Sequence, residues 1–257
     1  MSVSRGMVLF LVAACGSNNT DNLPPPGTGT TDAGVRIDAT SDGTTTPKDG
    51  TPSEIDAAII NGRVCLVTAD PRHIGLDPAS DCATTGANGL TVRLGDKVTT
   101  TADDGSFSID APATLAGAIW SVTGSSIVSS YKVFSDYQIP AFTTALYSSM
   151  LSANGVIPLP GQGSVIAQLV SNGAGATGMI GLSTPTSEYS AFFDGSTATT
   201  FQQTSSGSAG IMWLAGIDVG EATVTAGPPT FPNQFEITTP TQPIADGSLT
   251  FVTITFP

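Results

Sequence analysis

The fold that we expect for this chain is decided by the stretch Thr99-Thr100-Thr101-Ala102-Asp103-Asp104-Gly105-Ser106-Phe107-Ser108-Ile109. Two runs of β-forming residues flank an Asp-Gly pair, which is a strong signal for a turn between two strands. Just upstream, Leu90–Leu94 alternates apolar and polar residues, as a strand with one buried face does. Further upstream, a turn at Asn61-Gly62 is predicted to interrupt the β-branched run Ile59–Val67. This part of the chain is therefore predicted to consist of short strands joined by turns.

Composition favours the same fold class and excludes one kind of partner. The 257 residues include 29 Gly and 18 Pro, and only 11% are charged, which favours short strands with many turns over a helical bundle. The net charge is −13, whereas nucleic-acid binding needs basic patches that neutralise phosphates. We therefore expect no nucleic-acid partner, and an acidic surface that could attract cations.

Three segments together resemble a known domain family. These are Gly62-Arg63-Val64, Leu90-Thr91-Val92-Arg93-Leu94 and the Thr99–Ile109 stretch. Their order is similar to that of the carboxypeptidase regulatory-like domain, a transthyretin-like β-sandwich, over about 59–110. Two features depart from that family: the approach to the second strand, Thr85–Gly89, lacks its usual prolines, and a long loop carries cysteines. The resemblance implies an accessory module without catalytic activity.

A similar order of segments recurs about one hundred residues later (163 − 62 = 101), with an insertion around Glu188–Gln203. We therefore predict a mainly β protein with two Greek-key or transthyretin-like β-sandwich units, one at 54–113 and the other at 161–257. The segment 114–160 between them is predicted to carry a helix at about 140–153. The helix signals are Pro140 in its first turn, apolar residues spaced by four, and the stop Asn154-Gly155.

The two predicted units should bury separate sets of side chains. The first set is Val64, Leu90, Val92 and Phe107, and the second is Val165, Ile180, Ile211 and Trp213. Because sequential strands usually pair with one another, each set is expected to form its own cluster.

The N-terminus has the pattern of a secretory signal. Arg5 precedes the apolar run Met7–Val12, and two alanines and Cys15 follow it. Val12-Ala13-Ala14-Cys15 resembles the bacterial lipobox, which implies cleavage before Cys15 and diacylglycerol on its sulfur. Residues 1–14 would then be the signal peptide. The alternative is an ordinary cleaved signal with an incidental cysteine.

Residues 15–53 are predicted to be a disordered Gly/Pro/Thr-rich tether, because they carry too few large apolar side chains to offset the entropy of ordering.

Cys65 and Cys82 remain as an even pair in a chain that we expect to be exported. We favour a disulfide between them, which would close a loop of 17 residues (82 − 65 = 17). The alternative is a zinc site that begins with these two thiols and His73.

Three further groups of residues were weighed as sites. His73, with Asp70, Asp77 and Asp81 nearby, could belong to a catalytic triad, but we favour an exposed loop histidine. Asp103 and Asp104 are candidate calcium ligands, but we favour turn-forming aspartates. The aromatic residues could form a carbohydrate-stacking face, but we favour core or sheet positions for most of them. They are Trp120, Trp213, Tyr131, Tyr137, Tyr147 and Tyr189.

These patterns lead us to expect a non-enzymatic, surface-displayed lipoprotein that acts in binding or in envelope structure and needs no cofactor. Its partners would be a membrane, reached through the lipid on Cys15, and a protein or glycan ligand. It would be exported and anchored to the bacterial cell envelope, at the outer membrane. The alternative is a secreted hydrolase or a carbohydrate-binding accessory subunit, which would need a clustered acidic or Ser/His site in a deep cleft.

Overall fold

Strands dominate the computed structural model, which describes residues 58–72, 74, 82–195, 197–202, 204–229 and 236–257. The first seven strands are β1 (Ile59–Val67), β2 (Thr91–Leu94), β3 (Lys97–Thr100), β4 (Ser106–Asp110), β5 (Ile119–Thr123), β6 (Ser130–Val133) and β7 (Gln138–Phe142). Helix α2 (Thr144–Ala153) follows them. The remaining strands are β8 (Gln162–Ser171), β9 (Ala174–Gly175), β10 (Ile180–Thr184), β11 (Phe192–Asp194), β12 (Phe201–Gln202), β13 (Ile211–Asp218), β14 (Gly220–Gly227), β15 (Ile237–Thr238), β16 (Gln242–Ile244) and β17 (Leu249–Phe256). The predicted fold class, mainly β with one helix, is confirmed for this part of the chain.

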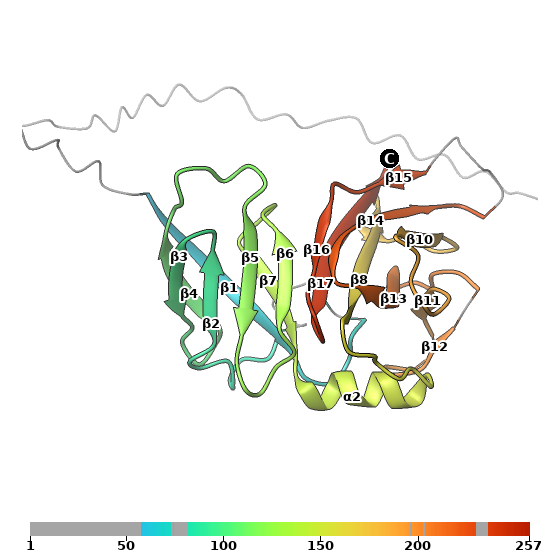
Figure 1. Cartoon of the computed structure of the whole chain (residues 1–257), viewed down its shortest axis with the longest axis horizontal. Helices are drawn as coiled ribbons and strands as arrows, with labels where there is room; N and C mark the ends of the chain where they lie inside the picture. The colour runs from blue at the N-terminus through green and yellow to red at the C-terminus, as the bar shows by residue number, and fades with distance from the viewer. Residues whose placement is uncertain (1–57, 73, 75–81, 196, 203, 230–235) are drawn as a thin grey trace, which may run out of the picture. The chain divides into compact units, whose positions relative to one another are not determined.

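The 54–257 unit has a first half, from β1 to β7, and a second half, from α2 to β17. The largest sheet among these residues runs through both halves. Its strand order is β12-β11-β13-β8-β17-β6-β5-β2-β3, with β9 added beside β8. The last strand of the chain, β17, lies in the middle and pairs in parallel with β8 on one side and β6 on the other (Figure 1). A strand from the C-terminus therefore joins the two halves by main-chain hydrogen bonds.

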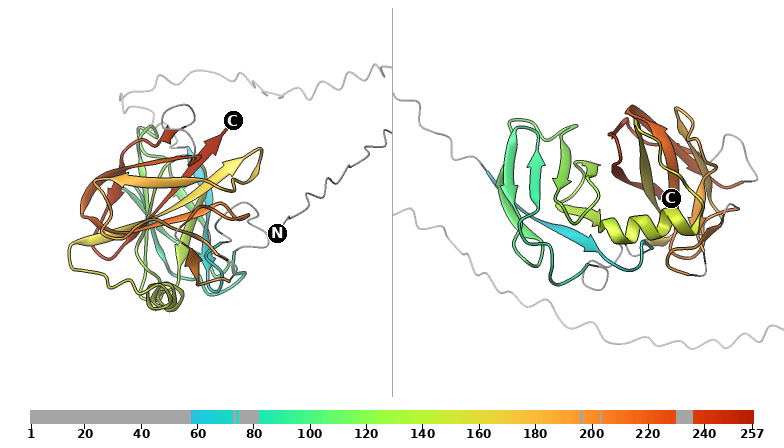
Figure 2. Two further views of the ribbon diagram at one scale, coloured as in Figure 1. Left: turned by 90° about the vertical axis from the view of Figure 1, so that its right-hand side faces the viewer. Right: turned by 60° about the horizontal axis from the view of Figure 1, so that its bottom comes forward.

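Two smaller sheets pack against the large one. The order β4-β1-β7 forms one of them, and its buried side chains share a core with those of β2 and β5. Strands β10, β14, β15 and β16 form the other, and they share a core with β8, β13 and β17. A third core lies between helix α2, the disulfide and the opposite face of β8, β13 and β17. Helix α2 lies along one end of the second-half strands (Figure 2).

The first sandwich extends beyond the predicted boundary at residue 113. Strand β5 pairs with β2, β6 pairs with β5, and β7 pairs in parallel with β1, so most of the predicted bridging segment belongs to the sheets of the first half. The reason is that β1 and β2 each pair with a second strand. These second partners lie later in the chain than the segment 62–109, on which the prediction rested.

The predicted start of the helix at about 140 is wrong. Pro140 lies in β7 opposite Cys65, and the helix begins at Thr144. Proline is tolerated here because β7 is an edge strand, whose ladder does not need every N–H. Thr143 caps the helix by accepting a hydrogen bond from the Leu146 N–H, and Asn154 ends it as predicted.

The predicted turn at Asn61-Gly62 is also wrong, because β1 continues through both residues. Gly62 pairs with Phe107, and a Cβ at this position would collide with the Phe107 ring and lie 2.8 Å from the Tyr137 carbonyl oxygen. This glycine therefore allows close packing within a strand.

One of the two predicted buried sets is confirmed. Val64, Leu90, Val92 and Phe107 belong to a single core. In the second set, Val165 lies in one core, Ile211 and Trp213 lie in another, and Ile180 is 37% exposed. The second half splits in this way because β8 and β13 are buried on both faces, so neighbouring residues of one strand point into different cores.

Candidate functional site

A groove opens where β17 and β6 diverge. The two strands pair only from Leu249↔Ser130 to Phe251↔Lys132. Beyond that point β6 ends at Val133, and the chain turns back into β7, while β17 continues along β8 alone to Phe256. The gap beside β17 becomes a cavity of about 570 Å³. Its lining includes Asn61, Arg63, Tyr137, Gln138, Gln168 and Thr253.

A second cavity, of about 430 Å³, lies against the same stretch of β17. The two cavities share lining residues on β6, on the turn after it and on β17, which are Lys132, Asp136, Phe251, Val252 and Thr253. The larger cavity reaches toward β1, β7 and β8, and the smaller one toward Pro240 and Gln242. Together they form one groove, which we call the β17 groove.

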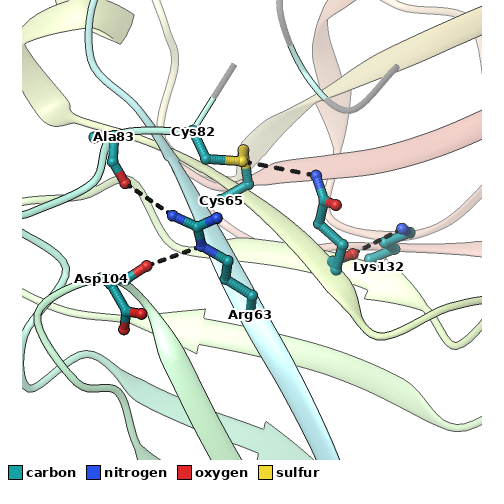
Figure 3. The surroundings of a disulfide bond; sticks show 7 residues. Arg63, Cys65, Cys82, Ala83, Asp104 and Lys132 are labelled. Atoms are coloured by element: carbon teal, nitrogen blue, oxygen red, sulfur yellow. Dashed lines mark hydrogen bonds between the residues drawn. A yellow bond between two sulfur atoms is a disulfide. The ribbon is translucent and has the colours of Figure 1, made fainter. Parts of the chain in front are cut away.

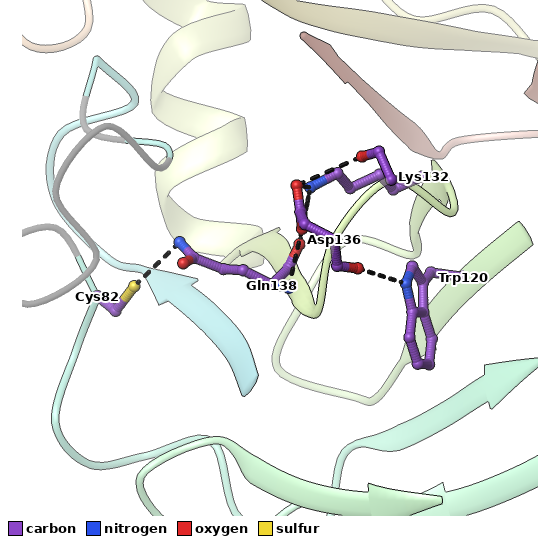
Figure 4. Close-up of polar contacts among 6 residues, drawn as sticks. Cys82, Trp120, Lys132, Asp136 and Gln138 are labelled. Carbon is purple, nitrogen blue, oxygen red and sulfur yellow. Dashed lines mark hydrogen bonds and ion pairs between the residues drawn. The ribbon is translucent and has the colours of Figure 1, made fainter. Parts of the chain in front are cut away.

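An ion pair forms the wall of the β17 groove (Figure 4). The Lys132 ammonium donates to both carboxylate oxygens of Asp136, at 2.7 and 2.8 Å, and to the carbonyl oxygen of Gln138 at 2.8 Å. The Asp136 carboxylate also accepts from the Gln138 N–H, and its backbone carbonyl accepts from the Trp120 indole N–H at 3.1 Å. These bonds join β6, the turn after it and β7 at the wall of the groove.

Arg63 supplies a second positive charge at the groove (Figure 3). Its Nε donates to the carbonyl oxygen of Asp104 at 2.9 Å, and one terminal nitrogen donates to the carbonyl oxygen of Ala83 at 3.5 Å. The side-chain and backbone hydrogen bonds from Ser106, with a smaller effect from the Arg63 charge, hold the pKa of Asp104 below its ordinary value. In the described part of the chain, the guanidinium thus bonds neutral carbonyl oxygens, and it keeps N–H donors that could meet a ligand.

The predicted disulfide is confirmed. Cys65 and Cys82 are bonded with a sulfur–sulfur distance of 2.00 Å, and both are buried. Beside Cys82, Ala83 donates its N–H to the carbonyl oxygen of Leu66. The disulfide and this hydrogen bond together hold Cys82 and Ala83 against β1. The Gln138 amide lies 3.8 Å from the Cys82 sulfur, which brings the disulfide close to the β17 groove (Figure 4). Because both sulfurs are in this bond, the alternative of a zinc site built on two thiolates is wrong.

Asp103 and Asp104 act as turn residues in this structure. Asp103 accepts a hydrogen bond from the Gly86 N–H, and Asp104 accepts from the N–H and hydroxyl of Ser106. The two carboxylates thus face different loops, and the described residues include no group of three or more His, Cys, Asp or Glu that could hold a metal ion. Local hydrogen bonding accounts for both aspartates.

Several predicted positions lie outside the described residues: the lipidation candidate Cys15, the tether 15–53, and His73, Asp77 and Asp81. Of the acids near the histidine, only Asp70 is described, and it forms an ion pair with Arg72. This pairing raises the pKa of Arg72 above its ordinary value.

The two tryptophans and one tyrosine are core residues, as we favoured. Trp120 and Trp213 are fully buried, and Tyr147 is also buried. Trp213 stacks on Phe192 with ring centroids 4.9 Å apart and meets Tyr147 edge-on at 6.3 Å. Burial raises the pKa of Tyr147, and its hydrogen bond with Ser164 opposes that shift only in part. The other tyrosines are partly exposed, and only Tyr137 lines the β17 groove.

Sequence reasoning missed the main residues of the β17 groove. Lys132 interrupts a run of β-forming residues, in a chain that has only eight Lys and Arg, and this scarcity was the available signal. Its partner Asp136 lies four residues later, but that spacing indicates a contact only on a helix. The exposed edge of β17 had no local signal, because it depends on where a remote strand ends.

The single helix in the described part of the chain is too short to span a membrane.

Comparison with known proteins yields low similarity only. No protein-family model matches the chain, and no curated protein matches it by sequence. Among solved structures, the chain is similar to GBS52, the minor pilin of Streptococcus agalactiae, at 12% identity over 76% of this chain and 95% of that one, with a TM-score of 0.24. A streptococcal ancillary pilin matches at 10% identity over 77% and 69% of the two chains, with a TM-score of 0.22. The TIE protein of Bacillus anthracis matches at 11% identity over 81% and 41%, with a TM-score of 0.25. Scores at this level carry no functional argument.

Proposed function

We propose that this chain is a non-enzymatic module for binding or envelope structure, displayed at the cell surface and anchored by a lipid on Cys15. The lipobox-like sequence before Cys15 supports the anchor. The disulfide between Cys65 and Cys82 supports export, because disulfides persist in oxidising compartments.

The observation that carries the binding proposal is the chemistry of the β17 groove. Its acid and its amine, Asp136 and Lys132, are bonded to one another, and the amine is nearly buried, with a side chain 9% exposed. A general acid or base must instead be free to reach a substrate. The rest of the lining combines apolar side chains, amides, the Arg63 guanidinium and a strand edge, which are groups that ligand sites use for recognition.

A binding screen with the purified full-length chain tests this proposal. The chain would be presented to glycan arrays and to envelope proteins from a bacterial host. Binding should weaken when the groove is filled by Thr253→Trp, because Thr253 is exposed and lines both cavities. The matched control is Val98→Trp on β3, where the side chain is 50% exposed on a different strand. Turnover of a glycan or peptide substrate that Thr253→Trp abolishes would overturn the proposal and favour a hydrolase.

The anchor is tested separately by Cys15→Ser. The variant should accumulate as unprocessed precursor or leave the membrane fraction. Recovery of the variant in membranes at the mature mass would contradict lipidation.

A further inference from the structure

The open edge of β17 carries main-chain groups that point into the groove. The Leu249 N–H donates to Ser129, before β6, and the Ser164 N–H of β8 donates to Ser248. Odd-numbered residues of β17 thus direct their peptide groups toward β6, and even-numbered ones toward β8, because this direction alternates along a strand. Thr253 and Thr255 therefore direct their N–H and C=O groups away from β8, beyond the point where pairing with β6 ends.

In the described part of the chain, no strand pairs with that edge after Phe251, and both threonines are exposed. Unpaired N–H and C=O groups in a row form a template for another strand. The two cavities of the β17 groove flank this edge, one toward β7 and one toward Pro240 and Gln242.

This arrangement matches what an added strand requires. Main-chain hydrogen bonds provide affinity, and successive side chains of the added strand point alternately into pockets on its two faces. Apolar surface is present in both cavities, from Val170, Pro140 and Phe251 in one and from Phe134, Val133 and Pro240 in the other. Two occupants of this edge differ in the space that they need. A folded second copy would bring a whole sheet against the turn that separates β6 from β7. A single extended segment needs only one strand width beside β17, about 4.8 Å.

Charge complementarity indicates the chemistry of the segment. The chain has a net charge of −13, but among the described residues the larger cavity is lined by two cations, Arg63 and Lys132, and one anion, Asp136. Lys132 is already neutralised by Asp136, whereas the guanidinium of Arg63 bonds only carbonyl oxygens within the described residues. A carboxylate beside Arg63 would add an ion-paired hydrogen bond to the two bonds that this guanidinium makes with carbonyl oxygens.

We propose that the β17 groove accepts an extended segment of another polypeptide, which pairs with Thr253 and Thr255 as an added strand and places an acidic side chain beside Arg63. The inference rests on the proposed binding function and specifies its ligand. If the groove binds a glycan or a folded protein instead, the binding function stands and this inference fails.

Amide hydrogen exchange on the purified full-length chain tests the open edge first. Without ligand, the amides of Thr253 and Thr255 should exchange fast and those of Val252 and Ile254 slowly, because only the latter point toward β8. The probe is a capped eight-residue peptide in which valine and threonine alternate and one position is glutamate. Added at up to millimolar concentration, it should slow exchange at Thr253 and Thr255 by about tenfold or more. Threonine amides that are already protected without peptide, or that stay unprotected with it, would overturn the proposal.

Matched variants separate strand addition from simple occupancy of the groove. Thr253→Pro removes an N–H that points away from β8, so it should leave the fold intact and weaken peptide binding by about tenfold. The control is Val98→Pro on the edge strand β3. A two-residue turn closes the β2–β3 hairpin at the hydrogen-bonded pair Leu94↔Lys97, so the next residue, Val98, also directs its N–H outward. Equal loss in both variants, or no loss in Thr253→Pro, would contradict strand addition.

The acidic position is tested with a second peptide that carries glutamine in place of glutamate. Wild-type protein should bind it about tenfold more weakly, and Arg63→Gln should remove most of that difference while still binding both peptides. Because the readout is the ratio of two affinities, a general loss of stability in the variant does not imitate the result. An unchanged ratio would remove Arg63 from the proposal.

Discussion

Lys132 and Asp136 form one ion pair, but we expect their replacements to have unequal effects on stability. The Lys132 side chain is 9% exposed and the Asp136 side chain is 51% exposed. Asp136→Asn keeps an oxygen that can accept from the Gln138 N–H, but it leaves a nearly buried ammonium with neutral acceptors only. Lys132→Met removes that ammonium and leaves a carboxylate that water can solvate.

The magnitudes follow from these exposures. Removing one partner of a fully buried ion pair costs about 3–5 kcal/mol. The half-exposed position of Asp136 and the remaining bond to the Gln138 carbonyl reduce this, so we expect about 2 kcal/mol for Asp136→Asn. Lys132→Met should cost about 1 kcal/mol or less, because exposed pairs contribute little and methionine preserves most of the buried stem. Once the ammonium is gone, the second replacement should add nothing, which gives a coupling energy of about 2 kcal/mol.

Urea unfolding of the wild type, both single variants and the double variant at pH 7 measures this cycle. Tryptophan fluorescence is a suitable probe, since the Trp120 indole donates to the Asp136 carbonyl. High salt should weaken the coupling only in part, because the ammonium is nearly buried but the carboxylate is half exposed. The reasoning is refuted if Lys132→Met costs as much as Asp136→Asn, or if the two effects simply add.

Three further predictions concern the first half and the core. Reducing the Cys65–Cys82 disulfide, which joins residues 17 positions apart, should cost about 3 kcal/mol in urea unfolding, and a double Cys→Ala variant should not respond to reductant. Gly105→Ala places a Cβ against a β1 carbonyl at φ +84°, so it should lower the free energy of unfolding by more than about 2 kcal/mol. Its control Gly89→Ala has φ +73° and open space around the new Cβ, and it should cost about 1 kcal/mol by the same assay. Burial raises the pKa of Tyr147 in the folded state. The stabilisation linked to this shift is complete below pH about 10, the unfolded-state value, and is lost as pH rises through the folded-state pKa. Tyr147→Phe should therefore lose less stability than wild type between pH 8 and pH 11.

Local chemistry in the sequence predicted the strands around the Asp103–Gly105 turn. Turn residues and alternation specify β2, β3 and β4 within a few positions. The partners β2 and β3 lie close in sequence, whereas β4 pairs with the distant strand β1 in another sheet. The disulfide was predictable because an even pair of cysteines has few alternatives in a chain whose N-terminus resembles a secretory signal.

Long-range pairing was not predictable in this way. Pro140 is a residue type that favours the first turn of a helix, but here it lies in the edge strand β7, which pairs in parallel with β1. Ile180 resembles a buried position in a strand, yet β10 pairs with β14 at the edge of a separate sheet and leaves this side chain 37% exposed. In both cases tertiary contacts override a correct reading of the residue's own preference.

The β17 groove arises from a mismatch in strand length. Strand β6 has four residues and β17 has eight, so pairing between them ends while β17 still has β8 beside it. A parallel neighbour must come from a distant part of the chain, because a tight hairpin cannot connect parallel strands. The turn that ends β6 and leads into β7 contains Asp136, which bonds both the Lys132 ammonium and the Gln138 N–H. The same strand that joins the two halves therefore has an edge beyond Phe251 with which no described strand pairs.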